Sequence, residues 1–289
     1  MDAFIMGDQG GSLETTPATL EDEARRAIDG DRIALDHLVR GLQDDLYGLS
    51  LRMFCNREDA EDATQEILIR IVTRLSQFDF RSKLKTWVYR VAVNYILDVK
   101  KSAVERMHLN FEHFADDLSD LTMQGPSETE QSLLIEEVKV GCTIAMLQHV
   151  DRPHRLAYIL GDILELPGPE AAEALEISPD LFRKRLQIAR TAILNFTKTY
   201  CGLASDSAPC RCNRLLPSVL RSGKVHPGHE NFAAKASSFE QTRAIVRQVD
   251  EARWAFHVHR TSHPRGSSVD FARRLVETLD ARKSLGPSS

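Results

Sequence analysis

The sequence predicts an all-α protein with two helical domains, an acidic linker between them and a mostly helical C-terminal extension. Apolar residues recur at spacings of three and four along most of the chain, which is the period of an amphipathic helix. An acidic stretch with a Gly-Pro-Ser breaker divides this pattern, and 289 residues give room for two or three small domains. The expected ranges are a disordered tail (1–19), a first domain (20–106), the linker (107–131), a second domain (132–199) and the extension (200–289).

The first domain centres on residues 57–101, where two amphipathic patterns flank a short loop. Carboxylates crowd the start of the first pattern, where the helix dipole favours negative charge. The loop, residues 77–83, and the second pattern are basic and aromatic. Upstream, residues 20–53 are typical of two more helices broken near Gly30, which would pack on the central pair and complete a compact domain.

Net charge alone says little about partners here. The formal net charge is −5, yet residues 81–101 are basic and no Lys or Arg occurs between Arg106 and Lys139. Local patches therefore decide whether the chain can bind nucleic acid.

In the second domain, residues 170–190 have the pattern of a helix-turn-helix: a short Ala-rich helix, a tight turn and a longer basic helix. This shape fits one helix into a major groove about 12 Å wide. Ser178 is suited to the N-cap position of the second helix and Pro179 to its first turn. We expect Leu181, Leu186 and Ala189 to face the core.

Two stretches of the chain resemble bacterial sigma factors of the extracytoplasmic-function (ECF) group. The run from Asp59 to Glu66, followed by Phe78-Asp79 and by the run from Lys85 to Asn94, resembles region 2 of these factors. Residues 170–190 resemble region 4, which in this family reads the −35 element. The match is long and ordered, and it ends after Tyr200.

The region 4 stretch departs from the family's pattern at two points. Glu176 stands where the family usually has Gly at the turn, and Pro167-Gly168-Pro169 replaces a more regular helix start. The geometry of the turn is therefore open at this point.

The resemblance implies a promoter-specificity subunit of RNA polymerase rather than an enzyme, with a different partner for each surface. The first central helix would dock on core polymerase, and the loop and second central helix would capture the melted non-template strand of the −10 element through stacking rings and phosphate-binding cations. Among the rings, we expect Trp87 to be largely buried and Phe80 to be exposed. The residues implied are Asp59, Glu61, Asp62, Gln65 and Glu66 for polymerase; Phe78, Phe80, Arg81, Lys83, Lys85, Trp87, Arg90, Asn94 and Lys101 for the −10 element; and Ser178, Arg183, Lys184, Arg185, Gln187 and Arg190 for the −35 element.

The extension carries Cys201, Cys210 and Cys212, followed by His226. These are soft ligands suited to zinc, although the Cys-x-Cys spacing is not that of a common zinc knuckle. Three interpretations stay open: a zinc site, a thiol redox switch and structural cysteines. The position of the extension also suggests control in cis, by covering the DNA or polymerase surface.

We expect a cytoplasmic protein without membrane insertion, because no apolar segment approaches the roughly 20 residues needed to span a bilayer. Core RNA polymerase, promoter DNA and an anti-sigma factor are the candidate partners. The competing hypothesis is a stand-alone helix-turn-helix regulator with a metal- or redox-sensing tail. An enzyme is disfavoured, because the chain lacks a nucleophile motif, a Gly-rich phosphate loop and a zinc-hydrolase spacing.

Overall fold

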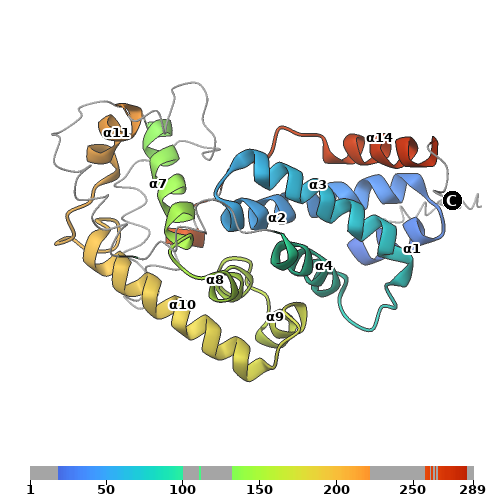
Figure 1. The fold of residues 1–289 in the computed structure, drawn as a ribbon, viewed down its shortest axis with the longest axis horizontal. Helices are drawn as coiled ribbons and strands as arrows, with labels where there is room; N and C mark the ends of the chain where they lie inside the picture. Colours follow the sequence, from blue (N-terminus) through green and yellow to red (C-terminus); the bar gives the residue numbers. More distant parts are fainter. Residues whose placement is uncertain are drawn as a thin grey trace, which may run out of the picture.

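The structure is a computed structural model that describes residues 19–99, 111, 132–221, 258–260, 262, 264 and 266–284. These residues form helices and no strand, which confirms the all-α prediction. The helices gather in two groups, α1 to α4 with α14 in one and α7 to α11 in the other (Figure 1). The expected linker lies outside the described residues except for Phe111, as does the expected tail up to residue 18.

The four helices predicted for the first domain are present. Gly30, with a φ of 98°, separates the first two, and the side chain of Asn56 caps the third by accepting a hydrogen bond from the Asp59 amide. A 3-10 turn and a short loop then lead into the fourth. The elements are α1 (Leu20–Ile28), α2 (Arg32–Phe54), α3 (Arg57–Arg74), the 3-10 turn (Leu75–Gln77) and α4 (Leu84–Asp98).

The second domain contains the predicted helix-turn-helix. Its helix α8 begins at Arg152, where the Asp151 side chain caps it by accepting from the His154 amide. The elements are α7 (Ser132–Leu147), α8 (Arg152–Tyr158) with a π-helical turn (Ile159–Ile163), α9 (Gly168–Ala174) and α10 (Pro179–Tyr200).

The turn between α9 and α10 has the tight geometry that the family usually builds with Gly. Glu176 occupies that position with a φ of 53°, in the left-handed region. Ser178 caps α10 as predicted, its hydroxyl accepting from the Leu181 amide at 3.2 Å. The expectation that Leu181 faces the core is wrong: it is 39% exposed and Phe182 is buried instead. Phe182 continues the stripe of Leu186, Ala189 and Ile193, and Leu181 lies one position off it.

Two buried arginines join the domains. Arg152 donates from Nη1 to the carbonyls of Ile96 and Val99, both at 2.8 Å, at the C-terminal end of α4. Arg155 donates from Nη1 to the Met53 carbonyl, at 2.7 Å, near the C-terminal end of α2. Cations at helix C-termini satisfy carbonyls that have no partner within the helix and interact favourably with the dipole. The start of α8 is therefore fixed to the first domain.

The described parts of the extension are helical and contact both domains. α11 (Cys212–Arg221) packs on α7. α14 (Phe271–Ser284), the last described helix of the chain, lies back against α2 and α3 of the first domain (Figure 1). Within the described residues, every helix is too short or too polar to cross a membrane.

Replacing Arg155 by Leu should lower the free energy of unfolding by about 2–4 kcal/mol, because each buried carbonyl that loses its donor costs about 1–3 kcal/mol. Urea unfolding of the full chain measures this. The exposed Arg183→Leu is the matched control and should stay within about 0.5 kcal/mol of the wild type. Equal unfolding midpoints for Arg155→Leu and the wild type would show that this side chain does not join the domains.

Candidate nucleic-acid interface

One face of α4 carries polar side chains at regular helical spacing. Lys83, Thr86, Arg90 and Asn94 follow one another at intervals of three, four and four, so they lie along one side of the helix. The opposite side is the buried stripe that includes Leu84, Val88 and Ala92. Sequence reasoning had named Lys83, Arg90 and Asn94 but missed Thr86, which the same spacing would have found. We call these four residues the α4 donor row.

The aromatic side chains before and within α4 form a cluster rather than an open platform. Phe78 is 4% exposed, and its ring centroid lies 4.5 Å from that of Phe80 and 5.3 Å from that of Trp87. In this structure the ring of Phe78 therefore fills the core under the loop and is not exposed at the surface. Trp87 and Phe80 are both half-buried, and the Arg25 guanidinium lies 3.8 Å from the centroid of the Phe80 ring.

The α4 donor row is occupied by carboxylates from the helix-turn-helix domain. Three glutamates at intervals of three, on α9 and the turn after it, lie alongside α4 (Figure 1). Sequence reasoning placed them in the helix-turn-helix and did not see this contact, which depends on how the domains pack. The pairs are Lys83 Nζ to Glu170 Oε1 (2.6 Å), Thr86 Oγ1 to Glu170 Oε2 (3.4 Å), Arg90 Nη2 to Glu173 Oε1 (2.5 Å) and Asn94 Nδ2 to Glu176 Oε2 (3.1 Å).

The other described cations predicted for the −10 element pair with carboxylates of the first domain. Arg81 lies 3.1 Å from the Asp79 carboxylate, and both side chains are largely exposed. Lys85 lies 2.9 Å from Asp45, whose carboxylate also accepts from the Tyr89 hydroxyl at 3.2 Å. Lys101 lies outside the described residues.

On α10, the side chains predicted to read the −35 element are mostly exposed. Arg183, Lys184 and Gln187 face solvent, with Arg183 paired to Asp180 and Gln187 donating to Thr191 at 3.3 Å. Arg185 is half-buried, and the hydroxyl of Ser178 serves as the helix cap.

Arg190 has a different role from the one predicted. Its guanidinium donates two hydrogen bonds to the buried carboxylate of Asp162, at 2.8 and 2.6 Å. The hydrogen bond to Asp162 raises the pKa of Arg190. In this structure Arg190 therefore joins α10 to the π-helical turn after α8.

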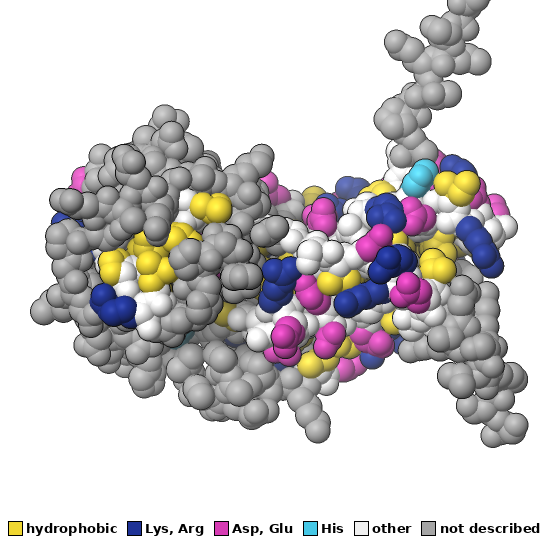
Figure 2. Space-filling model, turned by 90° about the horizontal axis from the view of Figure 1, so that it is seen from above, with side chains coloured by type: hydrophobic (Ala, Val, Ile, Leu, Met, Phe, Trp, Pro, Cys, Tyr) yellow, Lys and Arg dark blue, Asp and Glu magenta, His cyan; other side chains and the backbone are white. Residues whose placement is uncertain are grey.

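On α3, the residues predicted to dock on polymerase divide into two sets. Asp59 and Asp62 are exposed, and Glu66 accepts from Arg70 at 3.0 Å. Glu61 is covered by the segment before α14, accepting from Ser267 at 2.7 Å. Viewed from the α14 side, the first domain shows acidic and basic side chains interspersed (Figure 2). The amide of Gln65 is buried and has no hydrogen-bond partner among the described residues.

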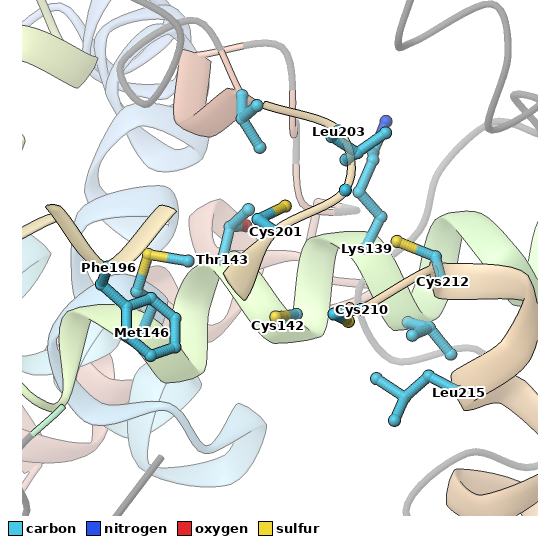
Figure 3. A pocket seen from close by; sticks show the side chains of 13 residues that line it. Lys139, Cys142, Thr143, Met146, Phe196, Cys201, Leu203, Cys210, Cys212 and Leu215 are labelled. Carbon is cyan, nitrogen blue, oxygen red and sulfur yellow. The ribbon is translucent and has the colours of Figure 1, made fainter. Parts of the chain in front are cut away.

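The three cysteines of the extension lie together, as the zinc and redox interpretations both require. Cys201, Cys210 and Cys212 line one pocket, and Cys142 of α7, which sequence reasoning had left out, lines it too (Figure 3). His226, the predicted fourth ligand, lies outside the described residues. In the described ranges, no three His, Cys, Asp or Glu side chains are already arranged to hold a metal ion.

Comparison with known proteins identifies a family match within the first domain and several similar proteins. The family described as Sigma-70 region 2 matches residues 38–105, which include α3 and α4. SigW of Bacillus subtilis, an ECF RNA polymerase sigma factor, is 26% identical over 173 residues, 55% of this chain and 91% of the relative. The sigma factor NccH of Alcaligenes xylosoxydans xylosoxydans is 29% identical over 182 residues, 62% of this chain and 95% of the relative. The chain is therefore similar to ECF sigma factors, and residues 38–105 match the family Sigma-70 region 2.

A third relative is the ECF sigma factor SigE of Mycolicibacterium smegmatis, 25% identical over 183 residues, 62% of this chain and 68% of the relative. A solved structure of CnrH in complex with the cytosolic domain of CnrY covers 59% of this chain and 91% of that chain, with 18% identity and a TM-score of 0.43. The similarity to sigma factors supports a role in transcription initiation.

Proposed function

We propose that this chain is an ECF sigma factor that binds core RNA polymerase in the cytoplasm and directs it to promoters, with α4 contacting the −10 element and α10 the −35 element. The observation that carries the proposal is the α4 donor row. Its four side chains hold carboxylate oxygens at 2.5–3.4 Å along one side of a helix. A row that accommodates spaced carboxylates has the charge and reach to bind successive phosphates of a DNA strand.

Base recognition at the −10 element needs a ring that can stack on an unpaired base. Phe80 and Trp87 are the half-buried rings beside the donor row, and Phe78 supports both from below. Stacking on such a ring is worth about 1–3 kcal/mol per base. Phe80 becomes more accessible if the Arg25 guanidinium moves off its face.

The −35 contact is supported by the geometry of α10. The tight turn at Glu176 and the Ser178 cap set the start of this helix, and Arg183, Lys184 and Gln187 are exposed within its first half. Long polar side chains near the N-terminal end of a recognition helix are those that reach base edges in the major groove.

The polymerase contact is supported by α3. Asp59 and Asp62 are exposed carboxylates suited to a basic partner, and the buried amide of Gln65 is without a hydrogen-bond partner among the described residues. A buried polar group of this kind normally finds a partner. Since exposed ion pairs contribute only about 0–1 kcal/mol each, apolar contacts at the rim must supply most of the affinity.

Both proposed surfaces are partly covered in this structure, which supports control in cis. The α4 donor row is occupied by α9, so the −10 strand can bind only after α9 has moved away. Glu61 lies under the segment before α14, which packs through the buried Phe271 and Leu275. An anti-sigma factor is a further candidate regulator, acting on the same surfaces.

In the holoenzyme, Arg90→Ala and Asn94→Ala should each slow open-complex formation about 10- to 150-fold, because each removes a hydrogen bond to a charged phosphate worth about 1.5–3 kcal/mol. Abortive transcription from a cognate promoter measures this. Arg274→Ala, on the exposed part of α14, is the control. If both α4 variants initiated transcription at the wild-type rate, the donor row would not contact the −10 strand. Tight operator binding without polymerase would favour a stand-alone regulator instead.

Weakening the carboxylate row should expose the −10 surface of the free chain. Glu170→Gln combined with Glu173→Gln should raise affinity for a single-stranded −10 oligonucleotide about 2- to 10-fold, since exposed ion pairs of this kind are worth about 0.2–1 kcal/mol each. Fluorescence anisotropy at low salt measures it. Glu58→Gln with Glu277→Gln changes the net charge equally and should have little effect. Identical affinities for both double variants would mean that α9 does not compete with DNA.

Undocking α14 should increase affinity for core RNA polymerase. Phe271→Asp with Leu275→Asp places charge in the contact with α2 and α3, where both side chains are at most 2% exposed. Val276→Asp, at a position 52% exposed on the same helix, is the matched control. The dissociation constant of the chain from core polymerase, measured with the polymerase immobilised on a surface, should fall for Phe271→Asp with Leu275→Asp and not for Val276→Asp. A constant unchanged in both would show that α14 does not control this surface.

A further inference from the structure

Four thiols from three separate stretches of the chain surround one small cavity (Figure 3). Cys142 comes from α7, Cys201 follows α10 directly, and Cys210 and Cys212 lie before and at the start of α11. The cavity has a volume of about 20 Å³. This is enough for one water-sized occupant, since a single water needs about 10–15 Å³.

The backbone around the cavity is built to bring the thiols close. Residues Cys201 and Cys210 pair as an isolated bridge, with the Gly202 amide donating to the Cys210 carbonyl at 3.0 Å and the Cys210 amide donating to the Tyr200 carbonyl at 3.1 Å. A Cβ at residue 202 would lie 2.3 Å from the Cys210 carbonyl oxygen. Only glycine permits the two backbone segments at this bridge to approach so closely.

Several groups around the cavity favour negative sulfur. The backbone N–H groups of Leu203 and Ala204 act to lower the pKa of the Cys201 thiol. Cys212 is the first residue of α11, where the helix dipole favours negative charge. Lys139, paired with Glu136 at 2.7 Å, contributes a buried cation to the lining.

Burial has the opposite effect, because it disfavours the negatively charged thiolate form of all four cysteines. It raises the pKa of Cys210 to about 12, and it raises the pKa values of Cys142, Cys201 and Cys212 as well. The geometry is what points to a ligand: four thiols from three stretches of the chain line one water-sized cavity, and four such groups are a common ligand set for structural zinc.

We propose that Cys142, Cys201, Cys210 and Cys212 bind one Zn²⁺ ion as four thiolates. On binding, the four thiols release four protons and form four Zn–S bonds, leaving a complex of net charge −2 that Lys139 partly offsets. Because no three side chains in the described ranges yet surround a common point, the thiols rotate into the cavity as the ion enters. Cys142 takes the position that the sequence alone had given to His226.

This site goes beyond promoter recognition and does not depend on it. It would join α7 of the helix-turn-helix domain to the start of the extension, since α11 packs on α7. Structural zinc supplies folding free energy directly. The metal would therefore stabilise the side of the second domain that is remote from α4 (Figure 1).

The test is the metal content of the full chain, purified without a metal-binding tag. Mass spectrometry of the eluted metal should find one zinc per chain in the wild type, in Cys55→Ser and in His226→Ala. Cys142→Ser and Cys210→Ser should each lose at least nine-tenths of it. Cys55, the remaining cysteine, does not line the cavity and controls for the substitution itself.

A second measurement needs no variant, so a variant that fails to fold does not leave the proposal undecided. Zinc K-edge absorption of the wild type should show four sulfur ligands at about 2.3 Å, and Co²⁺ added to the zinc-free chain should give the intense visible absorption of tetrahedral cobalt thiolate. A chain that takes up neither ion, a disulfide among these cysteines in the purified chain, or a ligand set that includes nitrogen would overturn the proposal.

Discussion

The arrangement of the whole molecule depends on two arginines buried between its domains. The Arg155 guanidinium donates to the Met53 carbonyl, to the Gln148 side chain at 2.8 Å and to the Val150 carbonyl at 3.0 Å, so the buried charge is fully surrounded by acceptors. Arg152 does the same for the end of α4. A buried cation is tolerated only with such partners. Together the two side chains fix α8, and with it the helix-turn-helix, against the first domain.

From this constraint follows the contact between α9 and α4. With α8 held at the ends of α2 and α4, the chain after the π-helical turn returns along α4, and the carboxylates of α9 reach the donor row. The donor row has the properties of a phosphate-binding surface, and α9 supplies anions of similar spacing. In the proposed function, one surface would serve two alternatives, an internal contact in the free chain and a DNA contact in the initiation complex. The internal contact is made of partly exposed pairs, which water and salt weaken, so it can exchange for DNA.

Local features of the sequence were sufficient to predict the helices and the helix-turn-helix. Ser178 as a cap, the break at Gly30 and the periodic stripes depend only on neighbouring residues, and the structure has all of them. Thr86 could also have been found, since it completes the spacing of the donor row. The exposure of Leu181 was misjudged by one position of a helical stripe.

What the sequence could not predict depends on contacts between distant residues. The burial of Phe78 follows from how the loop folds over Phe80 and Trp87. Arg190 was assigned to DNA because a cation on a recognition helix looks available until Asp162 is seen beside it. The approach of Cys142 to the cysteines of the extension likewise requires the packing of α11 on α7.

The most direct test of this account is the distance between the two domains in the free chain and in the initiation complex. Spin labels on non-natural residues at Leu97 of α4 and Asn195 of α10, both exposed, would report it by pulsed electron resonance. The account predicts one short distance in the free chain and a longer one when core RNA polymerase and promoter DNA are bound. The same short distance in a complex that initiates transcription would contradict it.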